Sequence, residues 1–98
     1  MCTSVQRLFV DRQAVETFVP KFVDAVRATE VGDPADPSVV IGPLISRAAA
    51  ERAARWVGEA VAAGARVLTG GTHEGALFVP TVLDRVEPTM RVVCEEIF

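Results

Sequence analysis

The side chains best able to act as nucleophiles in this sequence are two cysteines, Cys2 and Cys94, at opposite ends of the chain. The reactive form of cysteine is the thiolate, which forms where positive charge or a helix N-terminus lowers the pKa of the thiol. Neither cysteine has a second cysteine or a histidine close by, so the spacing predicts neither a metal site nor a disulfide framework. Cys94 follows Val92 and Val93 and is therefore expected to be a buried apolar residue.

The other candidates for chemistry are one histidine and one pair of adjacent glutamates. His73 lies among glycine, threonine and glutamate, and an imidazole without a nearby nucleophile or second metal ligand is most simply a solvated loop residue. Glu95 and Glu96 are neighbours, so their carboxylates are expected to point apart. The Gly70-Gly71 pair predicts a turn, and the sequence contains no phosphate-binding glycine motif after a strand.

Composition excludes several classes of protein. Of 98 residues, 50% are apolar and 23% are charged, with a formal net charge of −3, which excludes intrinsic disorder. The chain has neither the basic stripe nor the aromatic platform of a nucleic-acid-binding protein. No apolar run approaches the ~20 residues of a membrane span, and no leader segment is recognisable. Two isolated thiols favour a reducing, cytoplasmic setting.

Hydrophobic periodicity predicts the first elements that would position these side chains. Residues 5–10 are largely apolar and β-branched, which predicts a strand, and Asp11 is expected to cap a helix behind it. An apolar stripe at helical spacing predicts one helix, kinked at Pro20, that ends by the turn at residues 32–34. The stripe consists of Val15, Phe18, Val19, Phe22, Val23 and Val26.

A second helix is predicted from Ser46, a favourable N-cap, to Ala63, with Gly64 in a left-handed C-terminal cap. Small and apolar residues recur along its predicted buried face. They are Ala49, Ala53, Trp56, Val57, Ala60 and Val61.

Short strands are predicted at residues 66–69 and at residues 76–83, the second interrupted by Pro80. The tail from residue 90 to residue 98 is compatible with a strand at Val92 and Val93 or with a turn or short helix. Alternation of strands and amphipathic helices predicts an α/β fold, in which helices flank a partial parallel sheet. Such a small sheet would leave exposed edges, which is typical of part of a larger fold.

The residues around Cys2 add a resemblance to a known family. Cys2-Thr3-Ser4-Val5-Gln6-Arg7 resembles the segment that opens with the catalytic cysteine of the aldehyde dehydrogenase superfamily, where an arginine and then an apolar strand follow the nucleophile. Further segments similar to that family follow in order along the whole chain. They are Gly32-Asp33-Pro34, Ile41-Gly42-Pro43-Leu44-Ile45, Gly64-Ala65, Gly70-Gly71, Pro80-Thr81 and Glu95-Glu96-Ile97-Phe98.

The resemblance implies that residues 1–98 are a fragment of the catalytic domain of an enzyme that oxidises an aldehyde to a carboxylic acid with NAD or NADP. It implies that Cys2 is the nucleophile and that the reaction passes through a thiohemiacetal and then a thioester. By motif position, Glu96 is implied to hydrogen-bond the hydroxyls of the nicotinamide ribose, and Phe98 to pack beside that ribose. Of the two glutamates, Glu95 is less suited to this contact with the ribose.

The family's cofactor-binding domain, general-base glutamate and oxyanion-hole asparagine precede its cysteine and have no counterpart in this chain. The resemblance therefore implies that the fragment alone is inactive. Its implied partners are the aldehyde substrate, the rest of the enzyme chain and, at full length, further copies in a homo-oligomer. Two alternatives stay open: a non-catalytic α/β interaction module or gene remnant, and a hydrolase whose nucleophile Cys2 is exposed when Met1 is removed.

Overall fold

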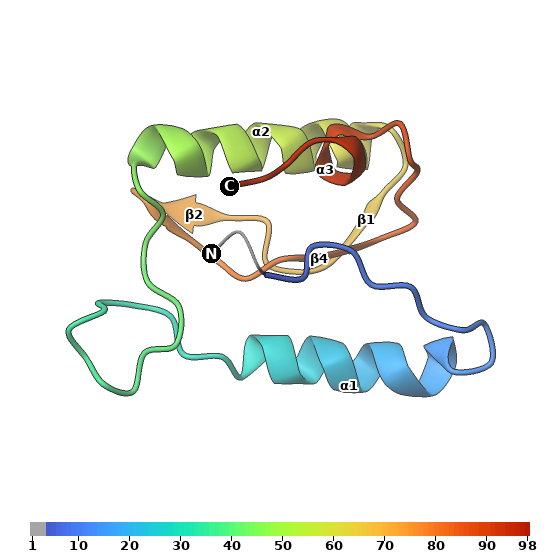
Figure 1. Ribbon diagram of the computed structural model, residues 1–98, viewed down its shortest axis with the longest axis horizontal. Coiled ribbons are helices and arrows are strands. Elements are labelled where there is room, and N and C mark those ends of the chain that lie inside the picture. The colour runs from blue at the N-terminus through green and yellow to red at the C-terminus, as the bar shows by residue number, and fades with distance from the viewer. Residues whose placement is uncertain (1–3) are drawn as a thin grey trace.

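The computed structural model describes residues 4–98, so Cys2 lies outside the described residues. In Figure 1, α1 and α2 lie on opposite sides of the strands, and α3 lies against α2. The elements within the described range are α1 (Val15–Arg27), α2 (Arg47–Ala62), β1 (Arg66–Thr69), β2 (His73–Glu74), β3 (Leu77–Phe78), β4 (Val82–Asp84) and α3 (Arg91–Cys94).

Both ends of α2 are fixed by the residues that the sequence predicts. The hydroxyl oxygen of Ser46 accepts a hydrogen bond from the backbone N–H of Ala49 at 3.2 Å, which satisfies a free donor of the first turn. After the last turn, Gly64 adopts a φ of 107°, and its N–H donates to the carbonyl of Val61 at 3.0 Å. This left-handed cap ends the helix where glycine avoids a steric cost.

The buried face of α2 consists mainly of alanines around one tryptophan. Its small side chains allow α3, β2 and β3 to contact the helix closely. Val61, which periodicity places on this face, is 45% exposed, so that prediction is wrong at the helix's last turn. The buried residues of α2 are Ala49, Ala50, Ala53, Trp56, Val57 and Ala60.

α1 is one helix that continues through Pro20, as the unbroken apolar phase predicts. It begins at Val15 behind Ala14, so the prediction that Asp11 caps it is wrong. Asp11 instead forms a preceding turn, in which its carboxylate accepts from the N–H of Gln13 at 2.8 Å and its carbonyl accepts from the N–H of Ala14 at 2.9 Å. The turn uses the side-chain acceptor that a helix cap would have needed.

The apolar stripe of α1 is only partly covered. Val23 is the only buried residue of this helix, which lies wholly within the described residues. Phe18 and Phe22 stack on each other with ring centroids 5.6 Å apart, and each is 37% exposed. The helix contacts β1, where the Arg27 guanidinium donates to the Leu68 carbonyl at 3.0 Å.

Within residues 4–98 the strands form two antiparallel pairs, β1 with β4 and β2 with β3. The predicted parallel direction of the sheet is therefore wrong, although helices and strands alternate as expected. The physical reason is the connection between β1 and β4: it contains no crossover helix but folds into the β2–β3 hairpin, which returns β4 beside β1 in the opposite direction. At one end of the first pair, Arg66 forms an ion pair with Asp84, and hydrogen bonding to this carboxylate raises the pKa of Arg66.

Residues 5–10 do not form the predicted strand: the structure describes all six and assigns none to a ladder. Their backbone has no strand neighbour within the described residues, and Val5 and Phe9 are 81% and 93% exposed. The predicted strand at residues 76–83 divides into β3 and β4 around Pro80, as expected where a ladder donor is missing. In the tail, Val92 and Val93 belong to the short helix α3.

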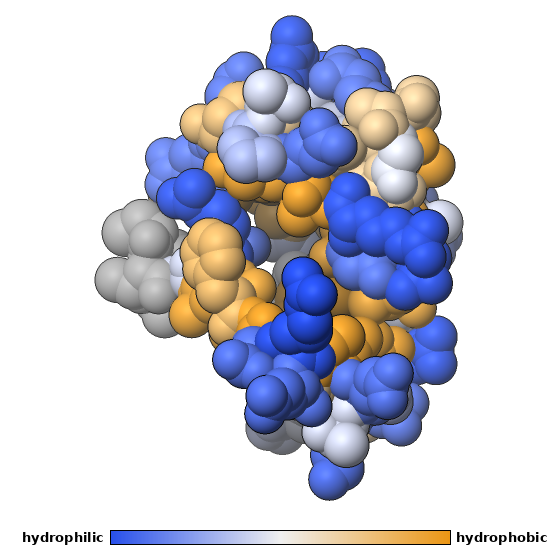
Figure 2. Space-filling view, turned by 90° about the vertical axis from the view of Figure 1, so that its right-hand side faces the viewer, coloured by the Kyte–Doolittle hydropathy of each residue, from blue (hydrophilic) through white to orange (hydrophobic). Residues whose placement is uncertain are grey.

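The chain exposes more surface than a self-contained protein of its mass. Its accessible area is 7143 Å², whereas a compact monomer of 10.5 kDa exposes about 5,400 Å². Figure 2 shows the consequence on one face, where apolar side chains reach the surface around a hollow between two polar ends. No helix within residues 4–98 combines the length and apolar character needed to cross a bilayer.

Candidate active site

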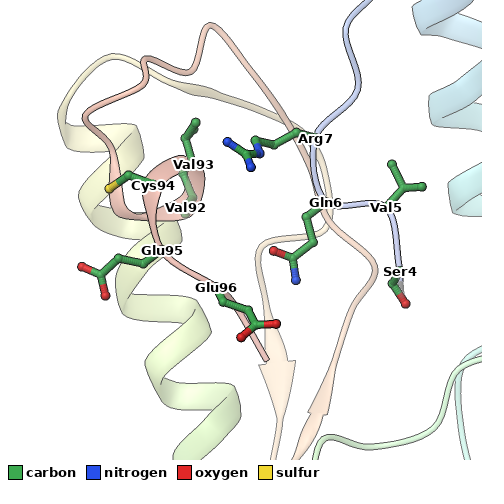
Figure 3. Close-up of a pocket in the computed structure, with 9 residues that line it drawn as sticks. All are labelled: Ser4, Val5, Gln6, Arg7, Val92, Val93, Cys94, Glu95 and Glu96. Atoms are coloured by element: carbon green, nitrogen blue, oxygen red, sulfur yellow. The ribbon is translucent and has the colours of Figure 1, made fainter. Parts of the chain in front are cut away.

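An open depression of about 620 Å³ lies between two segments from opposite ends of the chain. One wall is residues 4–7, which directly follow the cysteine-bearing start of the chain, and the other is residues 92–96. Figure 3 shows these segments facing each other, with α2 behind the second wall. The structure thus places the residues after Cys2 beside the segment that carries Glu96.

One hydrogen bond joins the first wall to the residue directly after the second wall. The side-chain amide Nε2 of Gln6 donates to the backbone carbonyl of Ile97 at 2.8 Å. The two residues are 91 positions apart in the sequence, so no local pattern predicts the contact. Sequence reasoning missed Gln6 for this reason.

The two glutamates of the tail differ clearly in their surroundings. Glu95 lies 3.6 Å from Arg91 as an ion pair, and its carboxylate points away from residues 4–7 in Figure 3. The Glu96 side chain instead extends on the side of the depression. Among residues 4–98, no ion pair or hydrogen bond occupies the Glu96 carboxylate. Of the two carboxylates, Glu95 is therefore paired with Arg91, and Glu96 is the one without a partner among the described residues.

Side chains of α2 and α3 hold the start of the tail. The Arg91 guanidinium lies 3.7 Å from the carboxylate of Glu59 and 5.9 Å from the ring centroid of Trp56. Arg52 lies 6.0 Å from the same ring, and its Nη2 makes a long contact of 3.5 Å with the Phe98 carbonyl. Two cations thus flank one buried indole. The negative face of the ring attracts both guanidinium groups and stabilises the packing of α2 with α3.

Phe98 and Cys94 are both exposed. Phe98 is 66% exposed. The prediction that Cys94 is buried is wrong: the residue is exposed, and its Sγ points away from residues 4–7. The reason is the helical turn of α3, which turns Cys94 away while Val92 and Val93 pack towards the core around Ala60 and Met90.

His73 is not simply a solvated loop residue. It lies in β2, is half-buried, and stacks on Phe78 with ring centroids 6.2 Å apart. Its Nδ1 lies 3.0 Å from the carbonyl of Gly75 across the hairpin turn. The histidine therefore has a structural contact, and it does not line the depression.

Comparison with known proteins agrees with the α/β architecture. Aldehyde dehydrogenase 21 from Physcomitrella patens, solved with the reaction product succinate, superimposes with a TM-score of 0.96 at 38% identity. The match covers 99% of this chain and 20% of that one. The described residues thus have the fold of a segment of a larger α/β enzyme, and the α/β class is confirmed.

The family follows from the sequence itself. The model of the aldehyde dehydrogenase family matches residues 1–98, and the chain belongs to this family. The vanillin dehydrogenase of Pseudomonas fluorescens is 41% identical over 98 residues, which are 100% of this chain and 20% of that protein. The 3-sulfolactaldehyde dehydrogenase of Priestia megaterium is 40% identical with the same two coverages. The chain therefore spans about a fifth of the length of the curated relatives it matches.

Proposed function

We propose that an enzyme containing this chain oxidises an aldehyde to a carboxylic acid with NAD or NADP, and that residues 1–98 belong to its catalytic domain. The observation that carries the proposal is the depression that joins residues 4–7, directly after Cys2, to the segment of Glu96. Relatives named for vanillin and 3-sulfolactaldehyde share the aldehyde group and little else. We therefore propose only the class of the substrate, which is an aldehyde.

Cys2 is proposed as the nucleophile. Its thiolate forms a bond to the carbonyl carbon, and the carbonyl oxygen takes the negative charge of the thiohemiacetal. The backbone N–H of Cys2 donates to that oxygen, a role in which one donor is commonly worth about 10²–10³ in rate. Loss of hydride from the same carbon leaves a thioester, which water cleaves to the acid and the free thiol. Bound NAD(P)⁺ supplies the hydride acceptor.

The residues of the tail fit the ribose end of such a cofactor. A carboxylate only accepts hydrogen bonds, and ribose hydroxyls donate them, so Glu96 has the required chemistry. Its carboxylate has no competing partner within residues 4–98. Phe98 offers an exposed ring two residues further along for packing beside the sugar. We propose these two residues as the chain's cofactor contacts.

The remaining parts of the reaction are proposed to come from the rest of the enzyme chain. These are the dinucleotide-binding domain, the general base that activates water and the oxyanion-hole amide. The 98-residue chain by itself is therefore proposed to be inactive. The full-length enzyme is proposed to be a homo-oligomer that works in the cytoplasm, where reducing conditions keep the Cys2 thiol available.

The test is Cys2→Ala in an enzyme that carries this segment together with the rest of an aldehyde dehydrogenase chain. We expect aldehyde-dependent NAD(P)H formation to be lost, because the variant lacks the thiolate that attacks the carbonyl carbon. The matched control is Cys94→Ala, which should keep its activity since the Cys94 sulfur points away from residues 4–7, the segment that follows Cys2. Undiminished activity of Cys2→Ala, or equal loss in both variants, would remove Cys2 as the nucleophile.

A second measurement tests the inactivity of the separate chain. The purified 98-residue chain is mixed with an aldehyde and NAD⁺ or NADP⁺, and reduced cofactor is followed by absorbance. We expect no signal above that of the Cys2→Ala chain. A signal that disappears in Cys2→Ala would show that these residues are sufficient for oxidation.

A further inference from the structure

We propose that Gln6 is a positioning residue that holds the cofactor-binding tail, residues 96–98, against the segment that follows Cys2. The inference rests on the proposed role of Glu96 as a cofactor ligand. Its basis is the hydrogen bond from Gln6 Nε2, on one wall of the depression, to the carbonyl of Ile97, the residue after Glu96 on the other wall. Gln6 itself does not need to touch substrate or cofactor.

The tail depends on such a link because α3 ends just before it. α3 has only four residues, and Glu95 leaves it with extended dihedral angles of −113° and 160°. Within the described residues, the carbonyl of Ile97 has no backbone donor. The Gln6 amide reaches that carbonyl at 2.8 Å, whereas the contact of Arg52 with Phe98 is at the 3.5 Å limit.

The position of Ile97 explains how one hydrogen bond can orient two contacts. Glu95 enters the tail with extended dihedral angles, and in extended backbone successive side chains alternate in direction. Burial along the tail follows such an alternation, since Ile97 is half-buried while Glu96 and Phe98 are exposed. The carbonyl that Gln6 binds belongs to the residue between them. Holding this peptide therefore limits the rotation of both cofactor contacts together.

The neighbouring side chains show that the role is specific to Gln6. Arg7 also lines the depression, but its guanidinium points towards the α3 side and makes no hydrogen bond or ion pair among residues 4–98. Val5 lies on the other side of Gln6 and offers no polar atom in its side chain. A neutral amide also avoids the strong charge pairing that would draw the Glu96 carboxylate away from a ligand.

The experiment compares Gln6→Met and Gln6→Lys in an enzyme that contains this segment and the rest of the chain. Methionine keeps the length of the side chain and removes the donor, whereas lysine restores an N–H donor. We expect Gln6→Met to raise the NADH or NADPH dissociation constant, measured by cofactor fluorescence, about 3- to 10-fold. The KM for the cofactor should rise in parallel, and the KM for aldehyde should stay unchanged. Gln6→Lys restores the donor but should recover little of the loss, because its ammonium would pair with the Glu96 carboxylate.

The matched control is Gln13→Met. Gln13 is also exposed, but it uses only its backbone N–H, in the turn with Asp11. We expect this variant to bind cofactor as the parent enzyme does. If Gln6→Met is too unstable to assay, Gln6→Glu removes the donor with the same shape and should weaken binding at least as much. Unchanged cofactor binding in the assayable variant, or equal weakening in Gln13→Met, overturns the inference.

A third variant separates this inference from the proposed function. Glu96→Gln should weaken cofactor binding by itself, and Gln6→Met should add little in that background because both changes affect one contact. If Glu96→Gln leaves the dissociation constant unchanged, the proposed role of Glu96 fails, and the inference fails with it. If Glu96→Gln weakens binding while Gln6→Met does not, only the inference about Gln6 is overturned.

Discussion

The two long helices are both amphipathic, yet only one of them is well covered. α2 buries six residues, four of them alanines, against α3 and the β2–β3 hairpin. α1 has bulkier apolar side chains, but buries only Val23, and its phenylalanines stay 37% exposed. Apolar periodicity thus identifies the face of a helix that requires a partner. Whether the partner lies within these residues depends on the rest of the fold.

The largest expected difference between the helices is in the unfolding free energy lost when an aromatic residue is replaced by alanine. Trp56 is 9% exposed and is flanked by two arginines. Trp56→Ala should lower the free energy of unfolding by about 3–5 kcal/mol, because it leaves a cavity in a packed face. Phe22→Ala, on the half-covered face of α1, should cost about 1 kcal/mol. Urea unfolding measures both, and equal losses would mean that the two faces are equally packed.

The next difference lies in the caps. Ser46→Ala removes the hydroxyl that accepts from Ala49, and should cost about 1 kcal/mol of unfolding free energy. The reciprocal change, Ala14→Ser at the start of α1, should give no comparable gain. Ala14 has helical dihedral angles of −92° and −16°, whereas Ser46 is extended, as a capping residue needs. Thermal unfolding of both variants checks this, and a clear stabilisation by Ala14→Ser would contradict it.

The smallest expected effect concerns the loop that connects the two helices. The backbone N–H and then the hydroxyl of Ser38 hydrogen-bond the Asp36 carboxylate and lower its pKa below the usual 3.8. Because the folded pKa is the lower one, the stabilisation is present above pH 3.8 and is lost as the pH falls through the folded value. Ser38→Ala should raise the Asp36 pKa part of the way back. A carboxyl NMR titration measures it, and an unchanged pKa would show that the hydroxyl contributes nothing.

Local chemistry explains the parts of the fold that the sequence predicts well. Ser46, Gly64 and Pro80 act on their own turn through a side-chain acceptor, a left-handed backbone and a missing donor. The limits of α2 and the break between β3 and β4 follow from them, and β1 lies at the predicted residues 66–69. Each of these effects acts within a few residues, so a single sequence is enough to read it.

Apart from the Asp11 cap, which a local turn displaces, the main predictions that were wrong concern how a segment packs against the rest of the fold. Residues 5–10 have the composition of a strand but no strand beside them among the described residues. The direction of the β1–β4 pair depends on how the intervening hairpin returns. Cys94 is exposed because the turn of α3 places its valine neighbours, and not its thiol, on the packed side. Periodicity and composition indicate whether a residue favours burial or a strand. A distant segment decides whether the fold provides that environment.

For the site, the sequence by itself determined which groups are present. Cys2, Glu96 and Phe98 stand in a motif order that resembles the aldehyde dehydrogenases, and membership of that family is confirmed over residues 1–98. Only the tertiary structure decided that residues 4–7 and 92–96 share one depression, that Glu95 turns to Arg91, and that Gln6 binds the Ile97 carbonyl. The physical reason is that a hydrogen bond across 91 positions requires both ends of the chain to be placed first. Folding does this through the packing of α2, α3 and the strands between them.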